Sequence, residues 1–545
     1  MSRLKWYGIG LVIGIVIVLF TSVLQIKTNL IADLMHWWEF NQHKETALII
    51  GRANDAIGLD PAVVTDQESL KVTINLYDTL VVYDRSGASV EPSLAESWSV
   101  SDNGLVWHFK IRQGVVFHDN TPLDAQAVIF NFNRWMDPSN PYHAGHFSYW
   151  NLSFGGFPGI VDHVRAISDD VVEIKLSEPY APFLNTLAMP AFGIASPEAI
   201  KTYNEALKYK PVGTGPFIFE SWNENGEIKL TKNSLYWGAK PKVDALIFKS
   251  IISHRERYVK LKGSEIHIAY DLPAQISNEL EEEDELTLSR RPVFNVGYLA
   301  FNMSNKHLKL ANVREAIGHM IDKDAMIEAA FDATTRPAST FVPPVLWGHH
   351  EGIESIAYDV DEAKRLLRKV GIRETIELNL LLMDSPREYF PNPVSLGLFL
   401  KDSFAKAGID LHLEILPWEE VIAKSKNGDY DMVLAGWNGD VADPDNFLYN
   451  FFASENTSKG LITNYSLYHN QEVDNLLSQA RQMNDQSFRE SLYREIQELI
   501  ALEIPAIPLI HTMPTIGLSK TVKGFVPHIS GVEPLNLVEL KEVAK

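Results

Sequence analysis

The sequence predicts an α/β protein of two or three domains. Its 545 residues are more than a single compact core usually contains, so the chain is expected to divide. Strand-like and helix-like runs alternate as β-α-β-α-β between residues 375 and 437, a pattern that favours a parallel sheet. Two extended apolar segments, 295–303 and 504–514, suit crossings of the chain between domains.

The composition excludes several classes of function. The formal net charge is −21, from 49 basic and 70 acidic residues, which argues against a nucleic-acid partner and against docking on anionic lipid. The chain contains no cysteine, so it has no disulfides, no thiolate nucleophile and no cysteine-based metal site.

The N-terminus predicts export. Arg3 and Lys5 precede an uncharged apolar run over residues 7–24, which is longer than a usual signal-peptide core and is followed by no A-x-A-like cleavage site. We therefore expect an uncleaved signal-anchor, a transmembrane helix over residues 1–26, and a tether over 27–46. The rest of the chain would lie outside the cytoplasm, in the periplasm, anchored to the inner membrane. A cleaved signal of unusual sequence is the alternative.

The first half of the folded part reads mainly as strands. Thr121 is expected to cap a helix that has Pro122 at its first position and continues to about Trp135. Gly213 and Gly215 match neither phosphate-binding pattern, because Pro216 follows and no helix begins there, so a tight turn is expected. Strand patterns occur at residues 48–51, 80–83, 104–117 (read as a hairpin) and 171–177.

The second half carries clearer helical patterns. Residues 312–331 predict an amphipathic helix or a pair of helices, and residues 486–501 predict another. The alternating unit comprises strands at 375–383, 409–416 and 430–437, with helices at 395–408 and 418–428. Gly408 and Gly428 stand just past the two helices, where a glycine commonly ends a helix.

Two opposite charges stand in loops that follow strands of this unit. Arg387 lies in SPREYFPNP and Asp440 lies in GWNGDVADPDNF, so both loops are expected at one edge of the sheet, where open α/β sheets bind ligands. A cation and an anion facing one pocket suit a zwitterion such as a short peptide, whose two extended residues span about 6–7 Å. Trp437 would be an aromatic wall of this pocket or a core residue.

Enzyme and metal motifs are missing from the sequence. Neither H-E-x-x-H nor G-x-S-x-G occurs. The histidine pairs His143/His146 and His349/His350 lack an obvious third ligand, so they are interpreted as loop or surface residues. We expect no catalytic residues, no metal and no cofactor.

From about residue 47 to 540 the chain resembles the family-5 solute-binding proteins of ABC importers. The resemblance is carried by PVGTGPF, NVGYLAFN, NVREAI, SPREYFPNP and GWNGDVADPDNF, and SNPYHAGHFSYW at 139–150 matches the dipeptide-binding subgroup. It implies that Arg387 takes the ligand carboxylate and Asp440 the ligand ammonium. It further implies that Trp437 lines the pocket, that Gly436 offers backbone hydrogen bonds, and that Tyr149 contacts the peptide from the other lobe.

The resemblance also implies an architecture and partners. It implies a two-lobed periplasmic-binding-protein fold of class II, with lobes that close over a dipeptide or short peptide and deliver it to the permease of an ABC transporter. We expect a monomer that is not an enzyme. The predicted parts are lobe 1 at 47–295 plus 510–545, an inserted subdomain at about 85–209 within it, and lobe 2 at 296–509.

Other functions stay open. Relatives in the family bind oligopeptides, antimicrobial peptides, haem or nickel complexes; an exported peptidase and an anchored scaffold are alternatives from other classes. Glu388 and Phe390 depart from what the Arg387 loop of the subgroup leads us to expect, since they add charge and bulk beside the carboxylate anchor. The choice of ligand is therefore expected to differ from that of the subgroup.

Overall fold

The computed structural model describes residues 46–85, 87, 89–331, 335–460 and 462–541. The predicted anchor and nearly all of the predicted tether lie outside these residues. Among the helices described, none combines the length and apolar character needed to cross a bilayer. Residues from Leu48 onward form one compact unit, which is described below by itself.

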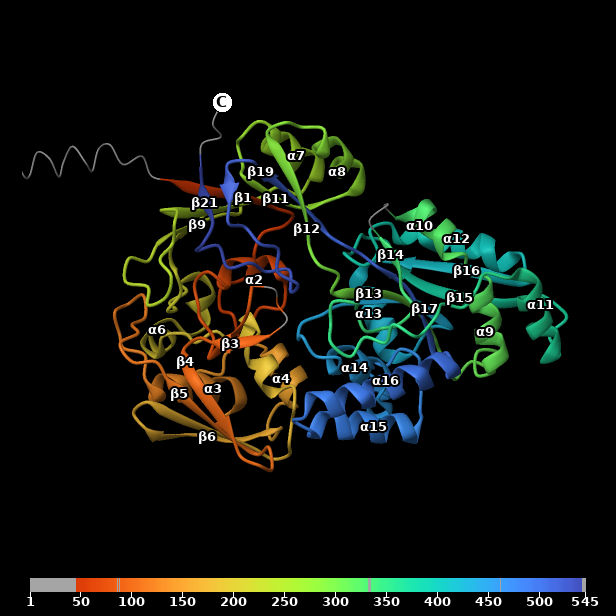
Figure 1. Cartoon of the computed structure of the whole chain (residues 1–545), viewed down its shortest axis with the longest axis horizontal. Coiled ribbons are helices and arrows are strands. Elements are labelled where there is room, and N and C mark those ends of the chain that lie inside the picture. Colours follow the sequence, from red (N-terminus) through yellow and green to blue (C-terminus); the bar gives the residue numbers. More distant parts are fainter. Residues whose placement is uncertain (1–45, 86, 88, 332–334, 461, 542–545) are drawn as a thin grey trace, which may run out of the picture. The chain divides into compact units, whose positions relative to one another are not determined.

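The first lobe is built on a mixed sheet of seven strands (Figure 1). Its central strand β1 pairs in parallel with β11, and β11 pairs antiparallel with β19. Helix α7 (His254–Lys262) packs beside β11 and β19, and α8 (Ala274–Glu281) packs beside β12 and β19. Helix α2 (Gln67–Thr73) follows β1 in the chain. In sheet order the strands are β12 (Leu286–Arg290), β19 (Thr515–Ser519), β11 (Ile268–Leu272), β1 (Ala47–Arg52), β10 (Ala245–Ser250), β9 (Glu227–Lys232) and β8 (Phe217–Trp222).

A smaller subdomain is inserted into the first lobe. Its antiparallel sheet has the order β4 (Ala95–Val100), β5 (Val106–Ile111), β7 (Val171–Leu176) and β6 (Val161–Ser168). Helix α3 (Ala125–Met136) packs on this sheet, and α4 (Ser148–Phe154) joins the core through Trp150, whose ring centroid lies 6.1 Å from that of Trp135. Beside them lie α5 (Phe183–Leu187), α6 (Pro197–Tyr203) and the ribbon of β2 (Val81–Tyr83) and β3 (Val90–Pro92).

Two predictions for this region were wrong. The helix begins at Ala125, not near Thr121, because the Asp124 side chain accepts a hydrogen bond from the Ala127 N–H at 2.8 Å and so caps it. The chain before it is extended, since Pro122 forms a bridge with Val116. Residues 104–117 do not form a hairpin of their own, because β5 ends at Ile111 and pairs with β4 and β7 instead.

The second lobe is built on a sheet of six strands with helices around it (Figure 1). Every residue of β13 is buried, as expected for a strand covered on both faces. In sheet order the strands are β14 (Arg336–Pro337), β18 (Ala506–His511), β13 (Asn295–Phe301), β17 (Met432–Asn438), β15 (Ile376–Met383) and β16 (Ile409–Leu416). The helices are α9 (Ala311–His319), α10 (Lys323–Ala330), α11 (Val360–Lys369), α12 (Pro393–Ala405), α13 (Trp418–Asn427), α14 (Asp445–Phe452), α15 (Gln471–Gln482) and α16 (Gln486–Glu503).

The predicted alternating unit is confirmed. Strand β15 lies between β16 and β17 and is parallel to both, and Leu380 pairs with Met432 across the β15–β17 ladder. The carboxyl ends of β15 and β17 therefore meet at one edge of the sheet. Residues 312–331 form the predicted helix pair, α9 and α10.

Two short connections join the sheets. Residues 291–294 lead from β12 to β13, and residues 512–514 lead from β18 to β19. The first connection precedes the segment 295–303 that we expected to be a crossing; that segment is instead a central strand of the second sheet. Both connections lie beside the edge at which β15 and β17 end, since Arg291 pairs with Glu388 after β15, the Gly439 N–H after β17 donates to the Phe294 carbonyl, and Thr512 Oγ1 donates to the Glu388 carbonyl.

Candidate functional site

A cavity of about 1000 Å³ lies between the two lobes. The first lobe contributes residues at the start of α2, at the end of β11 and on α4, and the second contributes the loops after β15 and β17. Thr512, Met513 and Pro514 of the second connection also line it. All five residues predicted to bind ligand face this cavity: Arg387, Asp440, Trp437, Gly436 and Tyr149.

Arg387 is held in place by its backbone and by a neighbouring ring. Its N–H donates to the Phe390 carbonyl and its carbonyl accepts from the Phe390 N–H, both at 2.9 Å, which closes a tight turn. Its guanidinium lies 4.1 Å from the centre of the Trp418 ring, a cation–π contact that orients it. No ion pair to Arg387 occurs within the described part of the chain, and its Nε is a buried donor without a partner. The donor is therefore free to bind an anion.

Asp440 stands directly after β17 and is fixed by Asn446 of α14. The Asn446 Oδ1 accepts hydrogen bonds from the Asp440 N–H and from the Trp437 Nε1, each at 3.0 Å. One carboxylate oxygen of Asp440 accepts a long hydrogen bond of 3.5 Å from the Tyr149 hydroxyl. Burial raises the pKa of Asp440 to about 7, because no cation in the described ranges pairs with it.

Tyr149 reaches the cavity because its neighbour is anchored. Trp150 is buried in the core of the subdomain, and adjacent helical residues point about 100° apart, so Tyr149 lies at the edge of that core and also lines the cavity. The Asp440 carboxylate raises the pKa of the Tyr149 hydroxyl, which keeps that hydroxyl neutral and able to donate. Tyr149 and Asp440 therefore meet from opposite lobes.

Gly436 and Trp437 form one wall of the cavity. A Cβ at Gly436 would collide with the Tyr389 ring, so only glycine permits this approach of strand and ring. Trp437 packs against Phe451 with the ring centroids 6.2 Å apart. Trp437 therefore both lines the cavity and contacts the core.

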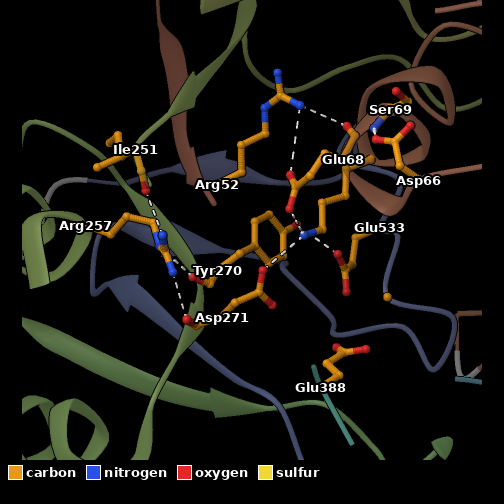
Figure 2. Close-up of polar contacts among 12 residues, drawn as sticks. Arg52, Asp66, Glu68, Ser69, Ile251, Arg257, Tyr270, Asp271, Glu388 and Glu533 are labelled. Carbon is orange, nitrogen blue, oxygen red and sulfur yellow. Dashed lines mark hydrogen bonds and ion pairs between the residues drawn. The ribbon is translucent and has the colours of Figure 1, made fainter. Parts of the chain in front are cut away.

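A network of charged residues along the first-lobe side of the cavity was not predicted (Figure 2). Lys71 Nζ lies 3.0 Å from Glu68 Oε1 and 3.3 Å from Asp271 Oδ2. Arg257 donates to the carbonyls of Tyr270 and Asp271 at 3.0 and 2.9 Å. Lys71 and Asp271 are 200 positions apart and follow no motif, so only the meeting of α2, α7 and β11 reveals the network.

The network continues through the first connection into the second lobe. Arg291 pairs with Glu388 Oε1 at 3.1 Å and with Glu533 Oε1 at 3.0 Å, and Tyr270 donates to the other oxygen of Glu533 at 2.8 Å. Burial raises the pKa of Glu388 and Arg291 opposes that effect. Glu388, which departs from the pattern of the dipeptide-binding subgroup, is therefore paired with Arg291 of the first connection and is not an unpaired charge. Within the described ranges, no three potential metal ligands group together.

Comparison with known proteins places this geometry in a family. The family described as bacterial extracellular solute-binding proteins, family 5, matches residues 89–459. The chain belongs to this family. It is 31% identical to the dipeptide-binding protein of Escherichia coli over 503 residues, which cover 89% of this chain and 92% of that protein. It is also 31% identical to di/tripeptide-binding protein 1 of Pseudomonas aeruginosa over 517 residues, covering 91% of this chain and 94% of that one.

Solved structures of relatives share the two-lobed fold. The periplasmic binding protein DppA of Helicobacter pylori, in complex with the peptide STSA, aligns with a TM-score of 0.78 at 31% identity, covering 92% of this chain and 100% of that chain. HbpA2 of Haemophilus parasuis aligns with a TM-score of 0.84 at 30% identity, covering 91% and 100% of the two chains. The predicted two-lobed binding-protein fold is thereby confirmed.

Proposed function

We propose that this protein is the extracytoplasmic substrate-binding component of an ABC peptide importer and that it captures dipeptides or short peptides. The observation that supports this best is the presence of Arg387 and Asp440 in one cavity, each without an ionic partner among the described residues. An isolated buried charge costs several kcal/mol, so both residues favour a ligand that brings the opposite charge. A free peptide supplies both.

In this proposal each predicted residue has one role. Arg387 forms a bidentate pair with the peptide carboxylate, and Asp440 accepts hydrogen bonds from the peptide ammonium. Trp437 lines the side-chain space, Gly436 offers its backbone to the peptide, and Tyr149 contacts the ligand from the first lobe. The protein binds and releases its ligand without chemistry, and it needs no cofactor.

The two lobes and the N-terminal segment have separate roles in capturing and releasing the peptide. The predicted bounds are 47–295 plus 510–545 for lobe 1, with an insertion at about 85–209, and 296–509 for lobe 2; strands β13 and β18 move Asn295, Ile510 and His511 into lobe 2. The lobes hinge at the connections 291–294 and 512–514 and close over the peptide. Residues 1–26 anchor the monomer in the inner membrane, with 27–46 as a tether, which raises its concentration near the permease.

Blocked dipeptides test the two charge sites separately. The full chain, purified in mild detergent and freed of bound ligand by unfolding and refolding, is titrated calorimetrically with Ala-Leu, Ala-Leu amide and N-acetyl-Ala-Leu. Each blocked form should bind about 100-fold more weakly than the free peptide, because it leaves one buried charge unpaired.

Two variants test which residue binds which end of the peptide. Arg387→Ala should remove the difference between free acid and amide, and Asp440→Asn should remove the difference between free amine and acetyl. Arg494→Ala is the control, since Arg494 is an exposed arginine of α16 that pairs with Glu490. If the free and blocked peptides bind the wild type equally, the proposal is wrong, and titration with longer peptides, haem and Ni²⁺ then identifies the alternative.

A further inference from the structure

Glu388 gives the carboxylate end of the cavity a negative charge of its own. It follows Arg387 directly and lines the cavity, with 18% of its side chain exposed. One of its oxygens pairs with Arg291 and the other accepts from the Asn438 amide. Its backbone carbonyl also accepts from Thr512 Oγ1 at 2.8 Å, so the carboxylate is held in one position.

Asp271 brings a second carboxylate to the same end from the first lobe. Figure 2 shows Asp271 on β11 and Glu388 on a separate segment below it. The charge on Asp271 is near enough to contribute to raising the pKa of Glu388. Asp271 lines the cavity, with 32% of its side chain exposed. The two carboxylates thus face the same space from opposite lobes.

The cations that balance these carboxylates lie behind them. Lys71, the partner of Asp271, is 2% exposed, and Arg291, the partner of Glu388, is 3% exposed. Arg257 also lines the cavity but donates its hydrogen bonds to backbone carbonyls, including those of Tyr270 and Asp271. Neither Lys71 nor Arg291 lines the cavity, so in each of these two ion pairs it is the carboxylate that a ligand meets.

The backbone at Asp271 is held in a costly conformation. Its φ is 55°, in the left-handed region that non-glycine residues rarely adopt, and the register of β11 against β19 shifts between Ala269 and Leu272. Arg257 fixes this bulge from behind. Bulges redirect side chains, and strain of this kind gathers at functional sites. The strain places the Asp271 carboxylate at the cavity wall.

We infer that Glu388 and Asp271 set the charge of the peptide side chain accepted next to Arg387: a basic side chain is favoured and an acidic one is rejected. This inference rests on the proposed function and names its substrate class. Glu388 follows Arg387 directly and both carboxylates line the cavity, so a lysine side chain next to Arg387 gains two anionic neighbours. A glutamate side chain meets two like charges in a low-dielectric space.

Matched dipeptides test the inference on the wild-type protein. Ala-Gln and Ala-Glu have the same shape and differ in charge, and Ala-Lys carries the opposite charge. Calorimetric titration at neutral pH should show affinity decreasing from Ala-Lys to Ala-Gln to Ala-Glu. Ala-Glu should bind at least about tenfold more weakly than Ala-Gln. Equal affinities for Ala-Gln and Ala-Glu overturn the inference, whereas failure of Ala-Gln to bind overturns the proposed function itself.

Two variants separate cavity charge from the hinge network. Glu388→Gln should reduce the ratio of Ala-Gln to Ala-Glu affinity severalfold, and this ratio is the readout whatever the change in Ala-Gln affinity itself. Glu533→Gln breaks the same Arg291 network from its other side, yet Glu533 is 1% exposed and does not line the cavity, so the Ala-Gln to Ala-Glu ratio should stay as in the wild type. If the ratio of Ala-Gln to Ala-Glu affinity changes equally in both variants, the inference is wrong. If Glu388→Gln does not fold, Asp271→Asn in the first lobe replaces it and should likewise reduce the ratio of Ala-Gln to Ala-Glu affinity.

Discussion

At the residue scale, the carboxylate of Asp440 is the group most sensitive to its surroundings. Burial raises its pKa to about 7, so the empty protein holds a proton there at a pH at which an ordinary aspartate has lost it. The folded empty chain thus binds this proton more tightly than the unfolded chain does. Asp440 consequently lowers the stability of the empty protein as the pH rises from about 4 to about 7, and this cost ends when an ammonium pairs with it.

The first prediction is that dipeptide affinity weakens in acid. An ammonium ligand needs the ionised carboxylate, and the peptide amine is itself mostly protonated below about pH 7.5, so the dissociation constant should rise about fivefold between about pH 7.4 and about pH 6. Titration at about pH 6 in buffers of different ionisation enthalpy should detect release of about one proton per dipeptide. Asp440→Asn should bind weakly at every pH with no such proton release. A flat profile in the wild type would contradict the pKa of about 7.

At the scale of elements, the alternating unit of the second lobe could be predicted almost completely from sequence. The strands β15, β16 and β17 have clear apolar patterns, and Gly428, at φ 74°, ends α13 as its position indicated. That unit suffices to bring Arg387 and Asp440 to one edge. The placement of both residues at one cavity is therefore a consequence of local patterns and of the parallel pairing of β15 with β17.

In the first lobe, the strands β1, β2 and β7 were predicted, whereas the cap of α3 and the charged network could not be, for physical reasons. Asp124 and not Thr121 caps α3, because two candidate caps lie within one turn and tertiary packing of the bridge at Pro122 decides between them. The contacts of Lys71 with Asp271 and of Arg291 with Glu533 join residues 200 and 242 positions apart. No local pattern encodes such pairs, since each depends on how two separate elements meet.

Helix α14 provides the second prediction, because it holds the ammonium loop through one side chain. Asn446→Ala removes the acceptor shared by Asp440 and Trp437, and dipeptide affinity should fall about tenfold for the loss of two hydrogen bonds. Asn446→Asp keeps an acceptor oxygen and should restore most of the affinity. Asn446 is thus a positioning residue.

Calorimetry and thermal unfolding check this role together. Asn427→Ala is the matched control, since the exposed Asn427 side chain donates only to the Ala423 carbonyl of its own helix. If Asn446→Asp binds as weakly as Asn446→Ala, orientation of the loop is not what Asn446 contributes.

At the scale of the whole body from Leu48 onward, the lobes touch on the side of the cavity away from the hinge. The Ala442 N–H of lobe 2 donates to the Tyr83 hydroxyl at 3.1 Å, and the Ala181 N–H of the subdomain donates to the Arg481 carbonyl at 2.6 Å. Val441 packs into the apolar cluster of the subdomain. These contacts stand next to Asp440, so ligand capture and lobe contact occur at the same place.

The last prediction concerns this contact. Tyr83→Phe leaves the Ala442 N–H without an acceptor when the lobes meet, whereas water can satisfy it when they part. The loss should weaken dipeptide binding about fivefold through a faster dissociation rate, since an unmet buried donor costs about 1 kcal/mol or more. Stopped-flow dissociation measures that rate. Tyr209→Phe, an exposed tyrosine, is the control. Because Tyr83 does not line the cavity, the preference for free over blocked peptides should be unchanged; a lost preference would place Tyr83 in ligand recognition and not in closure.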